Sequence, residues 1–396
     1  MKLLGIETSC DETAVCLIEA DGSPPAGGGE SFRYRVLGNA LLSQAALHAE
    51  YGGVFPSLAK REHAKNLVPM LEQALDAAGE LSTATEPSVG ATLIPLKALL
   101  EREPELFTSL AAHLLRYRKP PIDCIAVTAG PGLEPALWVG INFAKALALA
   151  WNVPLVAVNH MEGHVLMSLV SPEALKRFEF PVLSLLVSGG HTELVLSKQF
   201  GEYERLGETR DDAAGEAFDK IARLLDLPYP GGPEIARLAA EARAAGEPQF
   251  TLTPPMLRSK DFDFSFSGLK TEVRKIAEKN APLPLEMKKQ LALATENAIA
   301  LVLVAKTMRA AEEFGASTIV VGGGVSANVF IRKQLEDALA VADTSAQLLA
   351  PPPELATDNA VMIALAGYFH AAAGDTTEPD SIVAKGNLRL ETKRPL

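Results

Sequence analysis

The same order of apolar and polar segments occurs twice in this chain. Residues 2–20 consist of an apolar segment, a short polar turn and a second apolar segment, and residues 182–196 repeat this pattern. An apolar segment that runs through a glycine-containing turn into a helix follows at residues 122–140, and again at 318–328. The repeated order predicts a duplicated α/β unit whose two copies face each other across a cleft, each contributing one polar hairpin.

The composition sets the class of protein. The chain has 396 residues, enough for two domains, and its 48% hydrophobic and 22% charged residues are typical of a soluble globular protein. No apolar run reaches the length of a membrane span, and the first residues lack the pattern of a signal peptide, so we expect a cytoplasmic protein without membrane contact. Cys10, Cys16 and Cys124 have no Cys-x-x-Cys spacing, which fits a reducing compartment. The net charge of −12 argues against broad, charge-driven binding of nucleic acid but allows a local basic patch.

The tip of the first hairpin is rich in small polar residues. Thr8, Ser9, Asp11 and Thr13 could hold a phosphate through hydroxyl and backbone N–H groups, although a solvated hairpin tip would have the same composition. The turn at residues 129–132 precedes a helix, where it could bind an anion or simply connect strand and helix.

Two histidines lie four residues apart, at His160 and His164. On a helix they share one face and can bind one metal ion, or they are ordinary helix residues. Metalloproteases have the same spacing with a glutamate directly after the first histidine, whereas Glu162 comes two residues after it, which places it roughly 100° around the helix from the expected position. Asp358 precedes the last apolar segment, where it either caps a helix or completes a His/His/Asp ligand set.

Other segments have less distinct patterns. Apolar spacing predicts a helix over residues 57–78, which carries His63 as a polar residue near the cleft, and a long helix over residues 286–315. Residues 22–33 are typical of a flexible excursion. We expect residues 80–120 to form a surface insertion with a helix over residues 95–118.

Nine motifs, in order over nearly the whole chain, resemble those of one family. They are Gly5-Ile-Glu-Thr-Ser-Cys-Asp-Glu-Thr13, Ala129-Gly-Pro-Gly132, His160-Met-Glu-Gly-His164, Leu186-Val-Ser-Gly-Gly-His-Thr192, Asp211-Asp-Ala-Ala-Gly-Glu-Ala-Phe-Asp-Lys220, Tyr229-Pro-Gly-Gly-Pro233, Phe264-Ser-Phe-Ser-Gly-Leu-Lys270, Gly323-Gly-Val-Ser-Ala-Asn328 and Thr357-Asp-Asn359. The chain resembles the tRNA threonylcarbamoyladenosine synthases, whose bacterial members are the TsaD proteins, formerly called glycoproteases or O-sialoglycoprotein endopeptidases. The resemblance implies an α/β, two-lobed actin-like or heat-shock ATPase-like (ASKHA) fold of duplicated RNase H-like units around a nucleotide cleft.

The resemblance also implies an activity and a site. The reaction is transfer of the threonylcarbamoyl group from threonylcarbamoyl-AMP to N6 of adenosine 37 in tRNAs that read codons starting with A, with release of AMP. The implied ligands of one divalent metal, iron with zinc or magnesium as alternatives, are His160, His164 and Asp358. The implied substrate-binding residues are Leu186, Val187, Ser188, Gly189, Gly190, Asp219, Gly232 and Asn328. Asp11 or Glu12 is our candidate for orienting the substrate amine.

Domain boundaries and partners follow from the same resemblance. We expect an N-terminal lobe over residues 1–178, a C-terminal lobe over 179–357, and a terminal helix and tail over 358–396 that return toward the first lobe. The implied partners are the anticodon stem-loop of tRNA, the bacterial paralogue TsaB and the small ATPase TsaE. Lys270, Arg274 and Lys275 are predicted to form a local basic patch for tRNA. The insertion at residues 80–120 is longer than is typical of bacterial members.

Two other functions compete with this one. A metal-dependent peptidase would need Glu162 as general base beside an open zinc site. A catalytically inactive scaffold related to these ATPases should have lost the metal residues, yet His160, His164 and Asp358 are all present.

Overall fold

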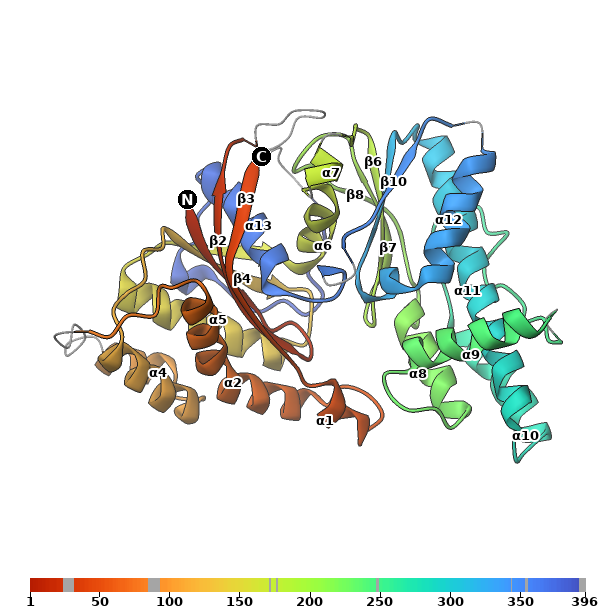
Figure 1. Ribbon diagram of the computed structural model, residues 1–396, viewed down its shortest axis with the longest axis horizontal. Helices are drawn as coiled ribbons and strands as arrows, with labels where there is room; N and C mark the ends of the chain where they lie inside the picture. Colours follow the sequence, from red (N-terminus) through yellow and green to blue (C-terminus); the bar gives the residue numbers. More distant parts are fainter. Residues whose placement is uncertain are drawn as a thin grey trace.

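Two five-stranded mixed sheets form the framework of the protein (Figure 1). In this computed structural model the first sheet has the order β3-β2-β1-β4-β5, and the second has the order β10-β9-β6-β7-β8. In each sheet the first three strands along the chain pair in antiparallel fashion, and the other two add in parallel. The two sheets therefore have the same topology, and the predicted two-lobed actin-like fold of duplicated RNase H-like units is confirmed.

The structure describes residues 1–23, 32–84, 93–170, 172–175, 177–246, 249–342, 344–352 and 355–391. Most of the excursion expected at residues 22–33 lies outside these ranges. The strands are β1 (Lys2–Glu7), β2 (Glu12–Asp21), β3 (Arg33–Ser43), β4 (Cys124–Gly130), β5 (Leu155–Asn159), β6 (Val182–Val187), β7 (Thr192–Ser197), β8 (Glu204–Glu208), β9 (Thr318–Gly322) and β10 (Gln347–Leu349). The helices are α1 (Ala45–Ala49), α2 (Pro56–Ala77), α3 (Leu93–Leu99), α4 (Pro104–Arg116), α5 (Glu134–Trp151), α6 (His160–Leu169), α7 (Pro172–Leu175), α8 (Ala214–Leu224), α9 (Gly231–Ala245), α10 (Ser267–Lys279), α11 (Leu285–Glu313), α12 (Val329–Val341) and α13 (Ala360–Ala372), with short 3-10 turns η1 (Gly324–Ala327) and η3 (Pro379–Ser381).

The helices form layers on both faces of each sheet. Successive residues of β1 alternate between two cores, with Leu3 in the core that also contains residues of α6 and α13 and Leu4 in the core that also contains residues of α2 and α5. Helix α6 also contacts β6 and β9, while α8, α9, α10, α11 and α12 contribute to the core on the far face of the second sheet. Helices α6 and α13 consequently lie between the two sheets (Figure 1).

The last helix packs on the first sheet, although it follows the second sheet in the sequence. Helix α13 crosses β1, β2, β4 and β5. The approach is close at Gly5, where a Cβ atom would lie 2.4 Å from the carbonyl oxygen of Ala360. Because α13 is fixed against β1 at its first turn, the residue two positions earlier, Asp358, is brought beside the first lobe.

The helix expected over residues 95–118 is not continuous. It is divided into α3 and α4, and Pro104 begins α4 because proline lacks the N–H that a continuing helix would need. Leucines of both helices, including Leu96 and Leu106, are fully buried in the same core as α2 and α5. The described part of this stretch therefore thickens the outer layer of the first lobe.

The long helix expected over residues 286–315 is confirmed as α11. Of the described helices it alone has the length and apolar character of a membrane span, and 72% of its most apolar stretch is buried inside the protein. It packs along α9 and faces the second sheet. This is the environment of a core helix.

Candidate active site

Three potential metal ligands converge at the start of α6. Asn159 caps this helix by accepting a 2.9 Å hydrogen bond from the Met161 amide, and the helical turn then places His160 and His164 on one face. Asp358 Oδ1 lies 3.3 Å from His160 Nε2 and 3.1 Å from His164 Nε2. The three ligand atoms all lie within 4.8 Å of one another.

The chemistry of these donors fits a divalent transition metal. Asn359, and not Asp358, caps α13 by accepting a 3.1 Å hydrogen bond from the Met362 amide, so the Asp358 carboxylate faces the two imidazoles. Two imidazole nitrogens and one carboxylate oxygen form a ligand set that iron(II) and zinc commonly take, with coordination positions left open for substrate.

A buried glutamate that the sequence analysis did not assign holds the first histidine. His160 Nδ1 donates to Glu7 Oε2 at 3.1 Å, and Thr128 donates to the same oxygen at 2.6 Å. The Ser9 amide donates to the other carboxylate oxygen. The bond from Nδ1 fixes the tautomer in which Nε2 can bind a metal. The available signal was a glutamate at the last position of β1, directly after the apolar residue Ile6.

The carboxylates favour positive charge at this position. Burial by itself raises the pKa of Asp358, but His160 and His164 hold it well below its usual range. Burial lowers the pKa of His160, yet Asp358 and Glu7 outweigh this and hold it well above its usual range. The pocket between the two carboxylates thus stabilises a cation.

Asp11 and Glu12, in the first hairpin, lie close enough to Asp358 for the charges to interact. Burial, followed by the charges of Asp11 and Asp358, raises the pKa of Glu12 to about 9. Burial and the charge of Asp358 also raise the pKa of Asp11. Ser43 donates a 3.1 Å hydrogen bond to Glu12 Oε1. The raised pKa favours the protonated form of Glu12, which can donate a hydrogen bond.

Open space adjoins several of the glycines expected to bind substrate. A Cβ atom at Gly189, Gly190 or Gly232 would meet no other atom within 4 Å. Asp219 accepts a 2.7 Å hydrogen bond from the Gly231 amide, which precedes Gly232. Burial raises the pKa of Asp219, and the charge of Asp11 adds to this effect, so the second-lobe carboxylate lies near the first hairpin.

Hydrogen bonds and core packing fix the positions of the remaining residues expected to bind substrate. Asn328 caps α12 by accepting from the Ile331 amide at 3.0 Å, while its amide nitrogen donates to Glu296 at 2.8 Å. The side chains of Leu186 and Val187 are buried in the core, so only their backbone can reach a ligand. Ser188 accepts a 3.1 Å hydrogen bond from the His191 amide within the β6–β7 turn.

His191 is a further residue near the metal ligands, and the sequence analysis did not assign it a role. Its pKa is lowered to about 4, first by burial and then by the charge of His160. The turn of the second lobe thus brings a neutral imidazole toward the histidines of the first lobe. The only sequence signal was its position directly after the glycine pair of that turn.

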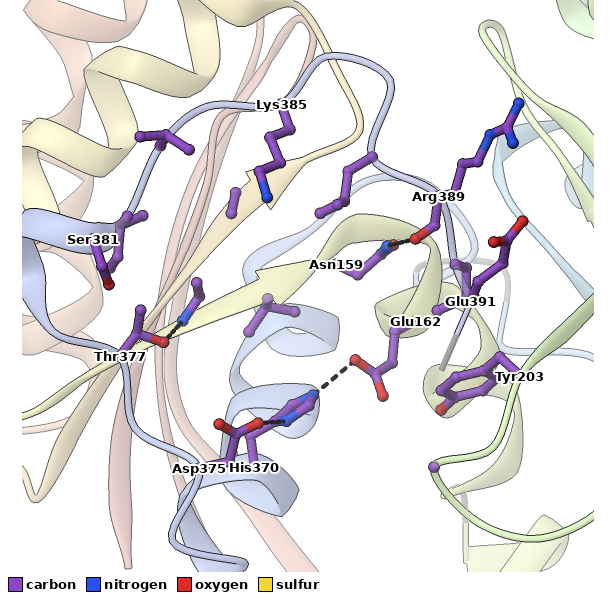
Figure 2. Close-up of a pocket in the computed structure, with 18 of the residues that line it drawn as sticks. Asn159, Glu162, Tyr203, His370, Asp375, Thr377, Ser381, Lys385, Arg389 and Glu391 are labelled. Atoms are coloured by element: carbon purple, nitrogen blue, oxygen red, sulfur yellow. Dashed lines mark hydrogen bonds and ion pairs between the residues drawn. The ribbon is translucent and has the colours of Figure 1, made fainter. Parts of the chain in front are cut away.

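Glu162 faces away from the metal ligands. Its side chain lines a cavity of about 720 Å³, together with those of Tyr203, Lys385 and Arg389 (Figure 2). Glu162 Oε2 lies 2.9 Å from His370 Nε2 on α13. A peptidase would need this carboxylate beside the metal, so its position argues against that alternative.

The pairing of His370 predicts a pH-dependent stability. Burial lowers its pKa, but Glu162 and Asp375 outweigh burial and raise it to about 9 from the ordinary value of 6.5. A raised folded-state pKa stabilises the fold fully below about pH 6.5 and loses this effect as pH rises through about 9. We expect His370→Gln to cost at most about 3 kcal/mol more at pH 6 than at pH 9.5, measured by urea unfolding. A cost that does not change with pH would contradict this assignment.

Comparisons with known proteins agree with these motifs. The family model described as tRNA N6-adenosine threonylcarbamoyltransferase (TsaD) matches residues 35–84 and 108–365. A protein of that name from Aromatoleum aromaticum is 43% identical over 376 residues, which are 94% of this chain and 92% of that relative. One from Polynucleobacter necessarius is 42% identical over 387 residues, 95% of each chain. Among solved structures, the ROK hexokinase from Thermus thermophilus aligns with a TM-score of 0.45 and 14% identity over 94% of this chain and 100% of that chain. The chain belongs to the TsaD family, the tRNA N6-adenosine threonylcarbamoyltransferases that form t6A in tRNA.

Proposed function

We propose that this transferase moves the threonylcarbamoyl group from L-threonylcarbamoyl-AMP to N6 of adenosine 37 in tRNAs that read ANN codons. N6 attacks the carbamoyl carbon, the bond from that carbon to the phosphate oxygen breaks, and AMP leaves as N6 loses a proton. The observation that carries this proposal is the convergence of the two lobes. The charge of Asp358 affects the pKa values of Asp11 and Glu12 in the first hairpin and of His191 in the second lobe. Asp358 also contacts His160 and His164.

We assign His160 Nε2, His164 Nε2 and Asp358 Oδ1 as the ligands of one divalent metal. Iron is the metal we favour, with zinc or magnesium as alternatives. When bound, a divalent ion supplies positive charge that stabilises negative charge on the acyl oxygen or on the leaving phosphate. Glu7 orients His160, and Asn359 leaves the Asp358 carboxylate available.

The second lobe holds the adenylate in this proposal. The backbone of residues 186–190, with open space beside Gly189 and Gly190, surrounds the phosphate. Asp219 accepts hydrogen bonds from a hydroxyl or amine of the substrate, and Gly232 and Asn328 adjoin the nucleoside. Glu296 restrains the amide of Asn328.

The first hairpin orients the attacking amine. Protonated Glu12 donates a hydrogen bond, and the Asp11 carboxylate accepts one from the substrate amine. Both groups are largely buried beside Asp358, where hydrogen bonds to the reacting atoms are stronger than in water.

These two roles predict different responses to isosteric substitution. Glu12→Gln keeps a neutral donor and is expected to retain transfer within about tenfold, whereas Asp11→Asn should lose about 10²- to 10³-fold in rate. The measurement is single-turnover transfer of labelled threonylcarbamoyl from the adenylate to tRNA.

Asp21→Asn is the matched control, since Asp21 lies at the far end of β2 and its side chain is 81% exposed. It should leave the rate unchanged. Full activity of Asp11→Asn would remove Asp11 from the mechanism.

In this proposal, partner proteins supply part of the tRNA-binding surface that this acidic chain lacks. The paralogue TsaB and the small ATPase TsaE complete the assembly in this proposal, which operates on the anticodon stem-loop in the cytoplasm. Lys270, Arg274 and Lys275 lie on α10, where Arg274 and Lys275 are exposed, and contribute contacts to the tRNA backbone. The working units are residues 1–178, 179–357 and the returning segment 358–396.

A further inference from the structure

Four buried polar side chains lie directly beneath the first hairpin. Thr13 and His63 are fully buried, as is His48, and Gln44 is 1% exposed. They come from β2, from α2, and from α1 with its N-cap residue. Buried polar groups of this kind must satisfy one another, and their hydrogen bonds can be followed atom by atom.

The hydrogen bonds form a chain with one direction. The Phe55 amide donates to His48 Nδ1 at 3.2 Å, so the proton of His48 is on Nε2, which donates to Gln44 Oε1 at 3.2 Å. The amide oxygen of Gln44 is then occupied, and its nitrogen donates to His63 Nδ1 at 3.2 Å.

This series of hydrogen bonds ends on the backbone of the first hairpin. Thr13 also donates to His63 Nδ1, at 2.8 Å, and His63 Nε2 donates to the carbonyl oxygen of Cys10 at 3.0 Å. The Gln44 amide N–H binds the next carbonyl, that of Asp11, at 2.9 Å. Two consecutive carbonyls that lead into Glu12 are thus held by this one cluster.

Only neutral imidazoles are compatible with this arrangement. A proton on His63 Nδ1 would face the side-chain N–H group of Gln44, and a proton on His48 Nδ1 would face the Phe55 amide. In agreement, burial lowers the pKa of His63 to about 4 and also lowers that of His48. Each member therefore has one fixed tautomer or amide orientation, and the terminal donor points at Cys10 without adding charge.

We propose that His63 is a positioning residue for the transfer reaction, which sets the conformation of the Cys10–Glu12 turn through its hydrogen bond to the Cys10 carbonyl. It touches neither substrate nor metal in this role. The proposal rests on the function proposed above for Asp11 and Glu12. Displacement of a catalytic group by about 1 Å can lower a rate by about 100-fold, so loss of one such bond has a measurable effect.

Two substitutions at position 63 separate the hydrogen bond from the packing. In His63→Gln the side-chain amide reaches the position of Nε2 and can still donate to Cys10. In His63→Asn the amide ends near the position of Nδ1 and cannot reach that carbonyl. We expect His63→Asn to lower the single-turnover rate at least about tenfold more than His63→Gln, with the KM for the adenylate within about twofold of wild type.

A double-mutant cycle with Asp11→Asn identifies the route of the effect. If His63 acts through the turn, His63→Asn should cost much less in the Asp11→Asn background than in the wild type. Rates are compared per molecule of folded, metal-loaded enzyme, so that a loss of stability alone does not count.

Three results would overturn the proposal. They are equal transfer rates for His63→Asn and His63→Gln, full additivity in the cycle, and a lower transfer rate of His63→Asn while Asp11→Asn stays fully active. The last result would show that the proposed function of the hairpin itself is wrong. Either of the first two, with Asp11→Asn slowed as predicted above, would leave that function in place and remove only the role of His63.

Discussion

His164→Ala is expected to abolish stoichiometric metal binding and to lower the transfer rate by at least about 10³-fold. His164 Nε2 lies 3.1 Å from Asp358 and is one of three converging ligand atoms. No other group of three His, Cys, Asp or Glu residues in the described part of the chain could replace it. Both metal content, by elemental analysis after loading, and single-turnover transfer should be measured.

The control removes a histidine of similar burial elsewhere. His113 on α4 pairs with Glu72 at 3.0 Å and lies in the outer helical layer of the first lobe. His113→Ala should keep metal content and rate, corrected for the folded fraction. If His164→Ala kept both as well, the metal site would be placed elsewhere.

Glu7→Gln is expected to weaken metal binding about 10- to 100-fold, because a neutral amide no longer increases the basicity of His160. The substitution keeps the size of the side chain and an acceptor for His160 Nδ1, so the protein should remain folded. At saturating metal the transfer rate should recover to within about tenfold of wild type. The measurement is the metal dissociation constant by competition with a chelator, followed by transfer assays across metal concentrations.

Glu72→Gln is the matched control for this experiment. It neutralises a carboxylate that also binds a histidine Nδ1 at 3.0 Å, but that histidine is not a proposed ligand. Unchanged metal affinity in Glu7→Gln would show that Glu7 is structural only.

The local patterns in the sequence predicted what depends on local geometry. The repeated order of strand, turn and strand led to the two matching sheets, and the four-residue spacing placed His160 and His164 on one face. The same helical geometry placed Glu162 off that face, where the structure finds it. Its partner His370 could not be predicted, because α13 reaches α6 only through tertiary packing.

The features that the sequence did not predict depend on contacts between segments that are distant in the chain. Asp211 lies shortly before α8, but Ala213 and not Asp211 occupies the N-cap of that helix. Asp211 instead accepts hydrogen bonds from the amides of Phe266 and Ser267 at the start of α10. Glu7 and His160 are likewise joined across the sheet and helix layers. No periodicity in the sequence predicts such pairs of residues.

In the proposed mechanism, one metal and one adenylate lie together between the two lobes. The most direct test is a crystal structure of the metal-loaded protein with a non-hydrolysable analogue of threonylcarbamoyl-AMP, with anomalous data at the absorption edge of the metal. We predict one anomalous peak bonded to His160 Nε2, His164 Nε2 and an oxygen of Asp358, with the analogue's phosphate beside Gly189 and Gly190. A metal bound elsewhere, or an analogue that does not approach these ligands, would contradict this arrangement.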